Sequence, residues 1–180
     1  MDGKQHAGRW TFSVLALVVC LFVACLEAQQ IRSPSCSRSH AIRMNPSLPP
    51  VPIRTPRLVL RPFQAQDLGA YADCHAQTEV YAFLYMAAPQ GDALKAQFEA
   101  LLAAPFERDG DTCRLAVVRQ DDGAVVGEVL LKIASLAALQ LEVGYIFNPR
   151  HAGQGYATES VAAMLEWGFN GLGAHRIFAR

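Results

Sequence analysis

The sequence predicts an α/β domain in which a mixed sheet carries helices on both faces. Three observations indicate this fold class: 52% of the residues are hydrophobic, strand-like and helix-like segments alternate along the chain, and a tight-turn signal joins two of the strand-like segments. A length of 180 residues suits one domain with an additional segment, and this apolar content is ample for a packed core.

The first half of the predicted domain contains one strand and two helices. Residues Arg57–Arg61 alternate around branched side chains and stop at a proline, as a strand does. Gln66–Gln77 is predicted to be helical, with Asp67 in a position suited to the first turn. Ala93–Phe106 is predicted as the second helix, because apolar residues recur there at helical spacing: Leu94, Phe98, Leu101 and Leu102.

The second half is predicted to contain three strands, a helix and a last strand. A strand over Arg114–Val118 leads through the tight-turn signal Asp121-Asp122-Gly123 into a partner strand. An antiparallel meander followed by a βαβ crossover gives a mixed sheet. The remaining elements are expected over residues 124–133 (strand), 139–147 (strand), 155 or 156 to about 170 (helix) and 176–179 (strand).

Residues 1–43 differ in composition from the rest of the chain. They contain five Lys/Arg and two Asp/Glu, a net charge of +3, whereas residues 44–180 contain eleven and fourteen, a net charge of −3. Lys4 and Arg9 precede the uncharged run 10–26, and a small residue follows at Ala28, so the segment resembles a secretory signal peptide with an imperfect cleavage site. An uncleaved membrane anchor is a second interpretation, and a weak lipoprotein motif at Cys25 is a third.

Translation from Met44 is the remaining interpretation of this segment. Residues 44–56 then form a Pro-rich leader and residues 57–180 form the domain. We expect a cytoplasmic protein in that case. If residues 1–28 are used, we expect a secreted or membrane-anchored protein, with membrane contact only where the run 10–26 is retained.

Charge and cysteine content exclude two classes of function. The net charge of −3 over residues 44–180 argues against a nucleic-acid partner, which requires a clustered positive field. The five cysteines form no Cys-x-x-Cys pair and no Cys/His spacing of zinc type. We therefore expect no metal site and no disulfide framework.

The stretch from Leu141 to Glu159 is the most informative about function. It combines a strand, a short loop with glycines at 153 and 155, and the start of a helix. Glycine lets the backbone approach a ligand closely, and the free amides of a first helical turn carry partial positive charge. Such a loop is a phosphate cradle, to which Arg150 adds a full charge. Thr158 and the lack of an acidic residue about twenty positions later exclude a dinucleotide fingerprint, and the lack of a following lysine excludes a P-loop.

The loop resembles the pyrophosphate loop of the GCN5-related N-acetyltransferase (GNAT) superfamily, Arg/Gln-x-x-Gly-x-Gly/Ala, which reads Arg150-x-x-Gly153-x-Gly155 here. The resemblance covers about residues 53–180. It implies an acyl-CoA N-acyltransferase-like fold and acyltransferase activity with acetyl-CoA as co-substrate. Four further landmarks are similar to the ribosomal-protein N-terminal acetyltransferase branch: Thr55–Phe63, Asp67-Leu68, Glu142-x-Gly144-Tyr145 and Gly155–Glu159.

The resemblance also implies which residues bind acetyl-CoA. Backbone amides from Arg150 to Gly155 would hold the pyrophosphate. The strand Tyr145–Phe147 would pair with the pantetheine amides, and one of its own amides would polarise the thioester carbonyl. The set expected at the coenzyme is Tyr145, Ile146, Phe147, Arg150, His151, Ala152, Gly153, Gln154, Gly155 and Tyr156.

Glu142 is the residue best suited to act as the catalytic base. Transfer to an amine requires a positioned acyl donor, a hydrogen bond to the developing oxyanion and a base for the amine proton. Glu142 is the one carboxylate in the apolar strand 141–147, and by alternation it shares a face with Gly144 and Ile146. The alternative is a structural carboxylate paired with an arginine.

The acceptor is expected to be a primary amine, and acid–base equilibria favour a protein N-terminal α-amine. An α-amine with a pKa near 8 is about 10% neutral at pH 7, whereas a lysine amine near 10.4 is under about 0.1% neutral. An α-amine therefore needs less help from a base.

The domain is expected to be incomplete at its C-terminal end. The family continues after the last strand with an Asn-x-x-Ser helix, further strands and frequently a tyrosine that protonates the leaving thiolate, whereas this sequence ends at Arg180. A non-catalytic CoA-binding module or an inactive fragment is therefore the alternative to an active enzyme.

Overall fold

The computed structural model describes residues 44, 49, 52–77, 81 and 88–180, all of which belong to one compact unit, Ala41–Arg180. Residues 1–43, with the apolar run 10–26, lie outside the described residues, as do residues 45–48, 50 and 51 of the Pro-rich leader. Among the helices described, none has the length and apolar character needed to cross a bilayer.

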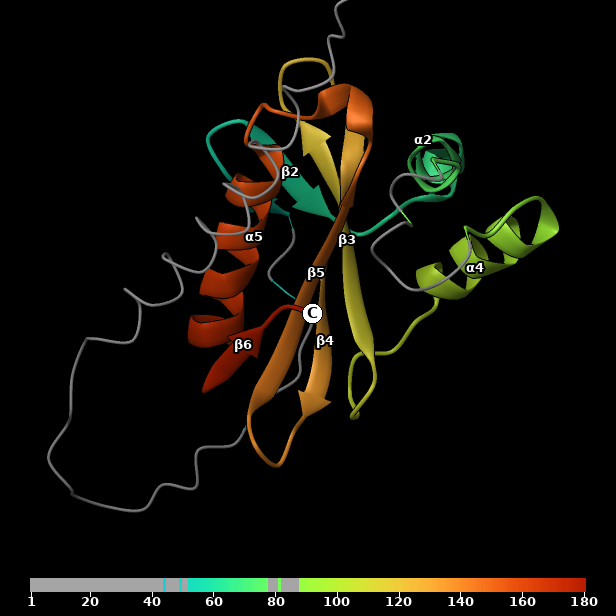
Figure 1. Cartoon of the computed structure of the whole chain (residues 1–180). Coiled ribbons are helices and arrows are strands. Elements are labelled where there is room, and N and C mark those ends of the chain that lie inside the picture. Colours follow the sequence, from blue (N-terminus) through green and yellow to red (C-terminus); the bar gives the residue numbers. More distant parts are fainter. Residues whose placement is uncertain (1–43, 45–48, 50–51, 78–80, 82–87) are drawn as a thin grey trace, which may run out of the picture. The chain divides into compact units, whose positions relative to one another are not determined.

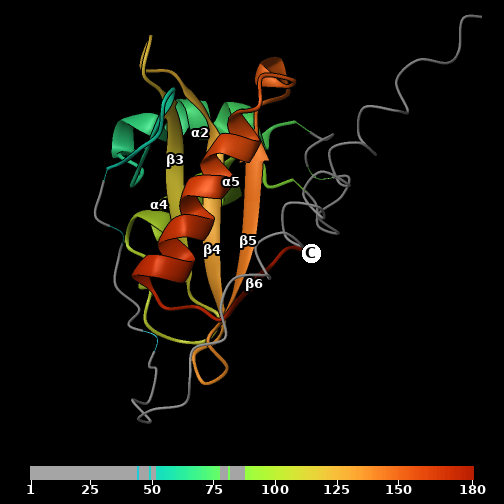
Figure 2. The same ribbon diagram turned by 90° about the vertical axis from the view of Figure 1, so that its left-hand side faces the viewer.

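A mixed sheet of six strands forms the centre of the fold (Figures 1 and 2). The strands lie side by side in chain order, antiparallel from the first to the fifth, while the fifth and sixth are parallel. This confirms the predicted meander and its final parallel strand. Their bounds are β1 (Ile53–Arg54), β2 (Leu58–Arg61), β3 (Thr112–Arg119), β4 (Val125–Ser135), β5 (Gln140–Phe147) and β6 (Arg176–Phe178).

Helices cover both faces of the sheet, as predicted. Helices α2 (Leu68–His75) and α4 (Asp92–Leu102) lie on one face, and α5 (Tyr156–Glu166) lies along the other (Figures 1 and 2). A 3₁₀ turn, η1 (Ala65–Asp67), precedes α2, and α5 continues into a turn of π-helix, η3 (Trp167–Gly171). The crossover from β5 through α5 to β6 is the βαβ unit that the sequence predicted.

Each face of the sheet has its own apolar core. The larger core joins the sheet to α5 and includes Leu131, Leu141 and Met164, none of which is exposed. The smaller core joins the sheet to α2 and α4 through the edge-on rings of Phe63, Tyr71 and Phe98. Both described cysteines are buried, and burial raises the pKa of Cys113 to about 12. They act as small apolar side chains.

Two predicted boundaries are wrong for identifiable reasons. The prediction extended α4 to Phe106, but the helix ends at Leu102 because Pro105 disfavours a helical conformation at the residue before it. Phe106 instead joins the larger core, where its ring lies 6.0 Å from that of Trp167. The prediction also began β5 at Leu139, whose φ of +54° is incompatible with a strand.

An ion pair fixes the chain between β2 and α2. Arg61 donates to both carboxylate oxygens of Asp67, at 2.6 and 2.9 Å, and the amide of Gln64 donates to the same carboxylate at 2.8 Å. Burial alone would raise the pKa of Asp67, but these hydrogen bonds lower it below its ordinary value.

Asp67→Asn is expected to destabilise the fold by about 1–3 kcal/mol at pH 7, the usual contribution of hydrogen bonds to a charged group. Because the native pKa is lowered, this stability is present above the unfolded pKa of about 3.9 and is lost as pH falls through the native value. Urea unfolding of both proteins at pH 7 and pH 3 measures the effect. A deficit that is the same at the two pH values would contradict it.

Candidate acyl-donor and amine site

The site begins where β5 and β6 separate. The two strands pair over three positions only, Gln140 with Arg176, Leu141 with Ile177 and Glu142 with Phe178. Beyond Glu142, β5 continues to Phe147 with β4 on one side, and no described strand pairs with its other edge. The edge from Val143 to Phe147 therefore has backbone groups that can pair with an extended ligand.

Strand β5 leads into a loop whose shape depends on two glycines in the left-handed backbone conformation. Asn148 ends β5, and a 3₁₀ turn, η2 (Pro149–His151), follows. Gly153 and Gly155 then both have φ of +77°, a conformation that L side chains rarely adopt. The chain thereby reverses into α5 with Gly155 as its N-cap.

The backbone amides of this loop divide into two groups. Those of Arg150, His151 and Ala152 are used within the loop: they donate to the side chain of Asn148, the carbonyl of Asn148 and the carbonyl of Pro149 respectively. In this conformation these three amides cannot donate to a ligand, whereas the sequence analysis expected them to hold the pyrophosphate. From residue 153 to residue 158, no described residue accepts from a backbone amide, and the amide of Glu159 is the first to bond within the helix. The free row therefore starts at Gly153, three residues later than expected.

Glu159 ties this loop to the start of the domain. Its carboxylate accepts from the hydroxyl of Thr55 at 2.6 Å, from the amide of Arg57 at 2.9 Å and from Nε of Arg57 at 2.7 Å. Arg57 Nη1 also donates to the carbonyl of Gln154 at 2.9 Å, and its guanidinium lies 5.0 Å from the ring centre of Tyr156. Because a peptide group is planar and trans, fixing the Gln154 carbonyl points the amide of Gly155 the opposite way, away from Arg57.

These contacts also set the charge of Glu159. Burial alone would raise the pKa of Glu159, but the Thr55 hydroxyl and the amide and guanidinium of Arg57 lower it below its ordinary value. Glu159 is therefore ionised at neutral pH. The sequence analysis named Glu159 only within a family landmark and missed its contacts with Thr55 and Arg57. The one available signal was that all three residues belong to the family landmarks.

Glu159→Gln is expected to weaken binding of coenzyme A by about threefold to tenfold, because the loop loses charged hydrogen bonds that hold its carbonyl and amide orientation. Tenfold corresponds to about 1.4 kcal/mol, within the range for one such bond. Isothermal titration calorimetry with coenzyme A measures it. Glu166→Gln, an exposed position on the same helix, is the control. An equal loss in both variants would contradict the role of Glu159.

A cavity of about 800 Å³ lies on the α2/α4 side of the sheet, beside β5. Every residue from Glu142 to Ile146 lines it, Val143 and Tyr145 included, so the lining alone does not separate the two faces of the strand. Its volume falls in the range of small-molecule sites. The cavity and the free edge of β5 thus meet along the same strand.

Glu142 lies in this cavity with about a fifth of its side chain exposed. In the sheet, Glu142 lies opposite Lys132 of β4 on one side and opposite Phe178 of β6 on the other. Arg180 Nη2 lies 3.1 Å from its Oε2, but that buried oxygen receives no hydrogen bond of good geometry from the described residues. The structure thus contains the arginine contact of the alternative interpretation, together with a carboxylate oxygen that keeps its capacity to accept a proton.

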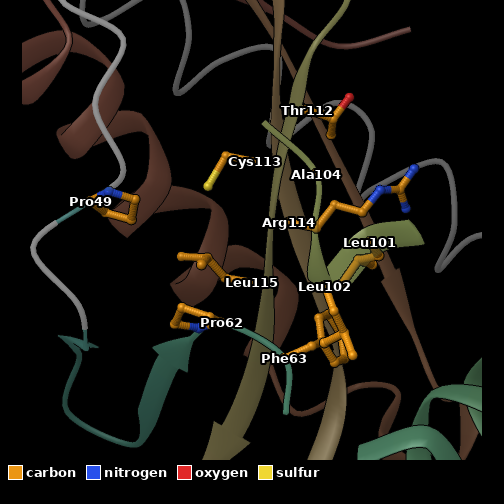
Figure 3. A pocket seen from close by; sticks show the side chains of 10 residues that line it. All are labelled: Pro49, Pro62, Phe63, Leu101, Leu102, Ala104, Thr112, Cys113, Arg114 and Leu115. Atoms are coloured by element: carbon orange, nitrogen blue, oxygen red, sulfur yellow. The ribbon is translucent and has the colours of Figure 1, made fainter. Parts of the chain in front are cut away.

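A second, smaller cavity does not suit a substrate. It has a volume of about 100 Å³ and lies between α4 and β3 (Figure 3). Figure 3 shows Cys113 and Arg114 leaving β3 in opposite directions, with Arg114 on the side of Leu101 and Ala104. Arg114 also lines the larger cavity, so this side of β3 contributes a cation to the candidate site.

Comparison with known proteins identifies the family. The sequence profile of the acetyltransferase (GNAT) domain matches residues 57–180. The chain belongs to the GNAT family. The GNAT fold and acyltransferase class expected from the sequence are therefore confirmed.

Similar GNAT proteins occur in bacteria. The uncharacterized N-acetyltransferase YnaD of Bacillus subtilis (strain 168) is 27% identical over 128 residues, which are 71% of each chain. The uncharacterized N-acetyltransferase p20 of Bacillus licheniformis is 24% identical over 126 residues, 70% of each chain.

Solved structures show the same GNAT fold. A GNAT acetyltransferase of Bacillus anthracis matches with a TM-score of 0.62 and 22% identity over 72% of each chain. The spermidine N-acetyltransferase of Vibrio cholerae, solved in complex with CoA and spermine, matches with a TM-score of 0.59 and 20% identity over 69% of this chain and 71% of that one. At these identities the likeness concerns the fold.

Proposed function

We propose that the chain transfers the acetyl group of acetyl-CoA to a primary amine. The observation that carries this proposal is the row of amides from Gly153 to Thr158, free of described acceptors, at the end of a strand whose edge is unpaired beyond Glu142. A ligand held at both places is an anion joined to an extended arm that contains amides. The phosphates and pantetheine of coenzyme A meet this description.

The residues present fit this donor. The amides of residues 153–158 would hold the pyrophosphate at a helix N-terminus, where the helix dipole favours an anion. The exposed side chain of Arg150 and the half-buried side chain of His151 lie in the same loop. The backbone of Tyr145, Ile146 and Phe147 would pair with the arm. From Glu142 to Phe147 the strand extends over about 17 Å, so the pyrophosphate and the base would lie toward opposite ends of one edge, and the arm would carry the thioester toward Glu142.

Glu142 would accept a proton from the attacking amine, directly or through water. Acetyl-CoA supplies the thioester, and an amide of β5 would stabilise the negative charge that develops on its carbonyl oxygen. The attack is direct and forms no covalent bond to the protein. The cavity beside Glu142, lined by Gly144 and Ile146, would receive the amine.

The charges of the cavity favour an acceptor with one amine over a polyamine. Among the described residues that line it, Arg114, Lys132 and Arg180 are cations and Asp111 and Glu142 are carboxylates, so these residues lack the excess of carboxylates that suits a polycation. A polycation such as the spermine bound by the Vibrio cholerae relative would meet these cations. We therefore propose an α-amine acceptor, such as a protein N-terminus. The likeness to a proposed ribosomal-protein-serine acetyltransferase of Vibrio cholerae, at 20% identity and a TM-score of 0.58, concerns the fold alone.

The test separates binding from turnover. Coenzyme A affinity is measured by calorimetry, and thiol release from acetyl-CoA is measured with a peptide that has a free N-terminal serine. Peptide-dependent thiol release supports the enzyme. Binding without release supports the alternative, a non-catalytic CoA-binding module. The same peptide with its N-terminus already acetylated is the matched control.

A further inference from the structure

A buried polar cluster lies beneath the larger cavity, apart from the residues assigned above. His75 of α2 and Glu128 of β4 are each 1% exposed. Nδ1 of His75 is in hydrogen-bond contact with the hydroxyl of Tyr81, and Nε2 of His75 lies 3.6 Å from Oε2 of Glu128. Arg114 Nη1 donates to Oε1 of Glu128 at 2.6 Å, and the ring of Tyr71 stacks on His75 with centres 4.0 Å apart.

The contacts of Glu128 determine which ring nitrogen of His75 carries the hydrogen. Nε2 of His75 and Oε2 of Glu128 are buried and receive no hydrogen bond from the described residues; they lie 3.6 Å apart, just beyond hydrogen-bond distance, so a small shift would join them. Glu128 forms an ion pair with Arg114, and a carboxylate in an ion pair accepts hydrogen bonds and donates none. The hydrogen of a neutral His75 must therefore be on Nε2, which makes Nδ1 an acceptor.

With the hydrogen of His75 on Nε2, the oxygen of Tyr81 can accept a hydrogen bond from a molecule in the cavity. Since Nδ1 accepts, the Tyr81 hydroxyl donates its hydrogen to His75, and its lone pairs remain available. Burial and the nearby charge of Glu128 raise the pKa of Tyr81, so its hydroxyl holds this hydrogen at neutral pH. The chain Tyr81–His75–Glu128 has the order of an acceptor oxygen, an imidazole and an orienting carboxylate.

The chain lies beside the part of β5 that is proposed to hold the acyl donor. Glu128 is paired across the sheet with Ile146, which is within the unpaired edge. Tyr81, His75 and Arg114 line the same cavity as Glu142. One molecule in this cavity is therefore bordered by two groups able to accept a proton.

In this reaction two protons leave the acceptor nitrogen. An acceptor amine that arrives as an ammonium ion, R–NH₃⁺, leaves as the amide R–NH–CO–CH₃ and so loses two protons from nitrogen. The balanced reaction is R–NH₃⁺ + acetyl-S-CoA → R–NH–CO–CH₃ + CoA-SH + H⁺. The departing thiolate ends with one of these protons and the solvent with the other, but each must first leave the nitrogen, and Glu142 is the one group assigned above to accept a proton from it.

We propose that Tyr81, oriented by His75 and Glu128, removes the first proton from the acceptor ammonium. The N–H bond of the ammonium breaks as its proton passes to the Tyr81 oxygen, and the Tyr81 hydrogen passes to Nδ1 of His75. The products are a neutral amine and an imidazolium whose Nε2–H faces Glu128. Tyr81 is the catalytic residue of this step, and His75 and Glu128 are positioning residues. The inference rests on the proposed function.

The test compares Tyr81→Phe with Tyr71→Phe, which removes another buried tyrosine hydroxyl of the cluster but leaves the contacts among Tyr81, His75 and Glu128 intact. Thiol release from acetyl-CoA is measured with the peptide bearing a free N-terminal serine, at pH 7 and pH 9, with coenzyme A affinity measured in parallel. For Tyr81→Phe we expect kcat to fall up to about tenfold at pH 7, because about 10% of an α-amine is already neutral there, with coenzyme A affinity unchanged. The deficit should shrink at pH 9, because an α-amine then arrives neutral. Tyr71→Phe should stay within about threefold of the wild type.

Three kinetic results would overturn the proposal: an unchanged kcat in Tyr81→Phe, an equal loss in Tyr71→Phe, or a loss of the same size at both pH values. Wild-type turnover with any of these refutes the proton chain alone. Absence of turnover in the wild type refutes the proposed function, and the proton chain with it.

A spectroscopic measurement does not depend on the variants. In the ¹⁵N spectrum of the wild-type protein, His75 should carry its hydrogen on Nε2 when neutral. A hydrogen on Nδ1 would overturn the chain.

Discussion

Glu142→Gln is expected to lower kcat by about 10²–10⁴-fold, the usual contribution of a general base, while coenzyme A affinity stays unchanged. The amide has nearly the same shape as the carboxylate and cannot accept a proton at neutral pH. The coenzyme's anion is proposed to bind at the other end of β5, so its affinity should not respond. Steady-state kinetics of thiol release and calorimetry measure the two quantities separately.

Two control variants make this prediction specific. Glu99→Gln changes a carboxylate on α4 that is 63% exposed, and it should have no effect on kcat. Arg180→Ala removes the arginine that lies 3.1 Å from Glu142. If Glu142 serves only as the partner of Arg180, then Glu142→Gln and Arg180→Ala will have equal effects, and the role of base is refuted.

Gly153→Val is expected to weaken coenzyme A binding by about 10–100-fold. Its φ of +77° is costly for a residue with a Cβ, by roughly 1–2 kcal/mol. A Cβ at this position meets no protein atom within 4 Å, so the space beside it is open to a ligand. Branched carbons there would displace the phosphates from amides whose charged hydrogen bonds are each worth about 1.5–3 kcal/mol. Calorimetric titration with coenzyme A measures the loss.

Gly123→Val is the matched control for this change. Gly123 lies in the turn between β3 and β4 and has φ of +73°, and a Cβ added there would likewise meet no protein atom within 4 Å. Both variants should lose similar stability, but only Gly153→Val should lose affinity. If Gly123→Val binds coenzyme A as weakly as Gly153→Val, the assignment of the loop to phosphate binding is refuted.

Local patterns in the sequence predicted most of the fold. Alternation, helical spacing and prolines are properties of neighbouring residues, and they placed every strand from β2 to β6 and all three helices within a few residues. The two-residue strand β1 fell in the Pro-rich leader and was missed, because it exists only through its pairing with β2. The end of α4 was overestimated because the spacing of Leu101 and Leu102 outweighed the effect of Pro105.

The site was predictable only in part. The glycines and Glu142 follow from chemistry that the residues carry themselves, and the resemblance to GNAT proteins supplied their roles. Which amides remain free could not be predicted, because it depends on the turn that Asn148 makes with Arg150 and His151. The contact of His75 with Glu128 joins residues that are distant in sequence, and a single sequence contains no information on such pairs.

The link between Thr55, Arg57 and Glu159 spans more than a hundred residues of sequence. It cannot form during synthesis until α5 has emerged and docked against the beginning of the domain, so the anion-binding end of the fold is completed late. A bound donor would then resist the parting of these two chain segments. At a concentration one hundred times its dissociation constant, such a ligand adds about 2.7 kcal/mol to the free energy of unfolding. The share of folded protein would thereby rise with the concentration of the proposed donor.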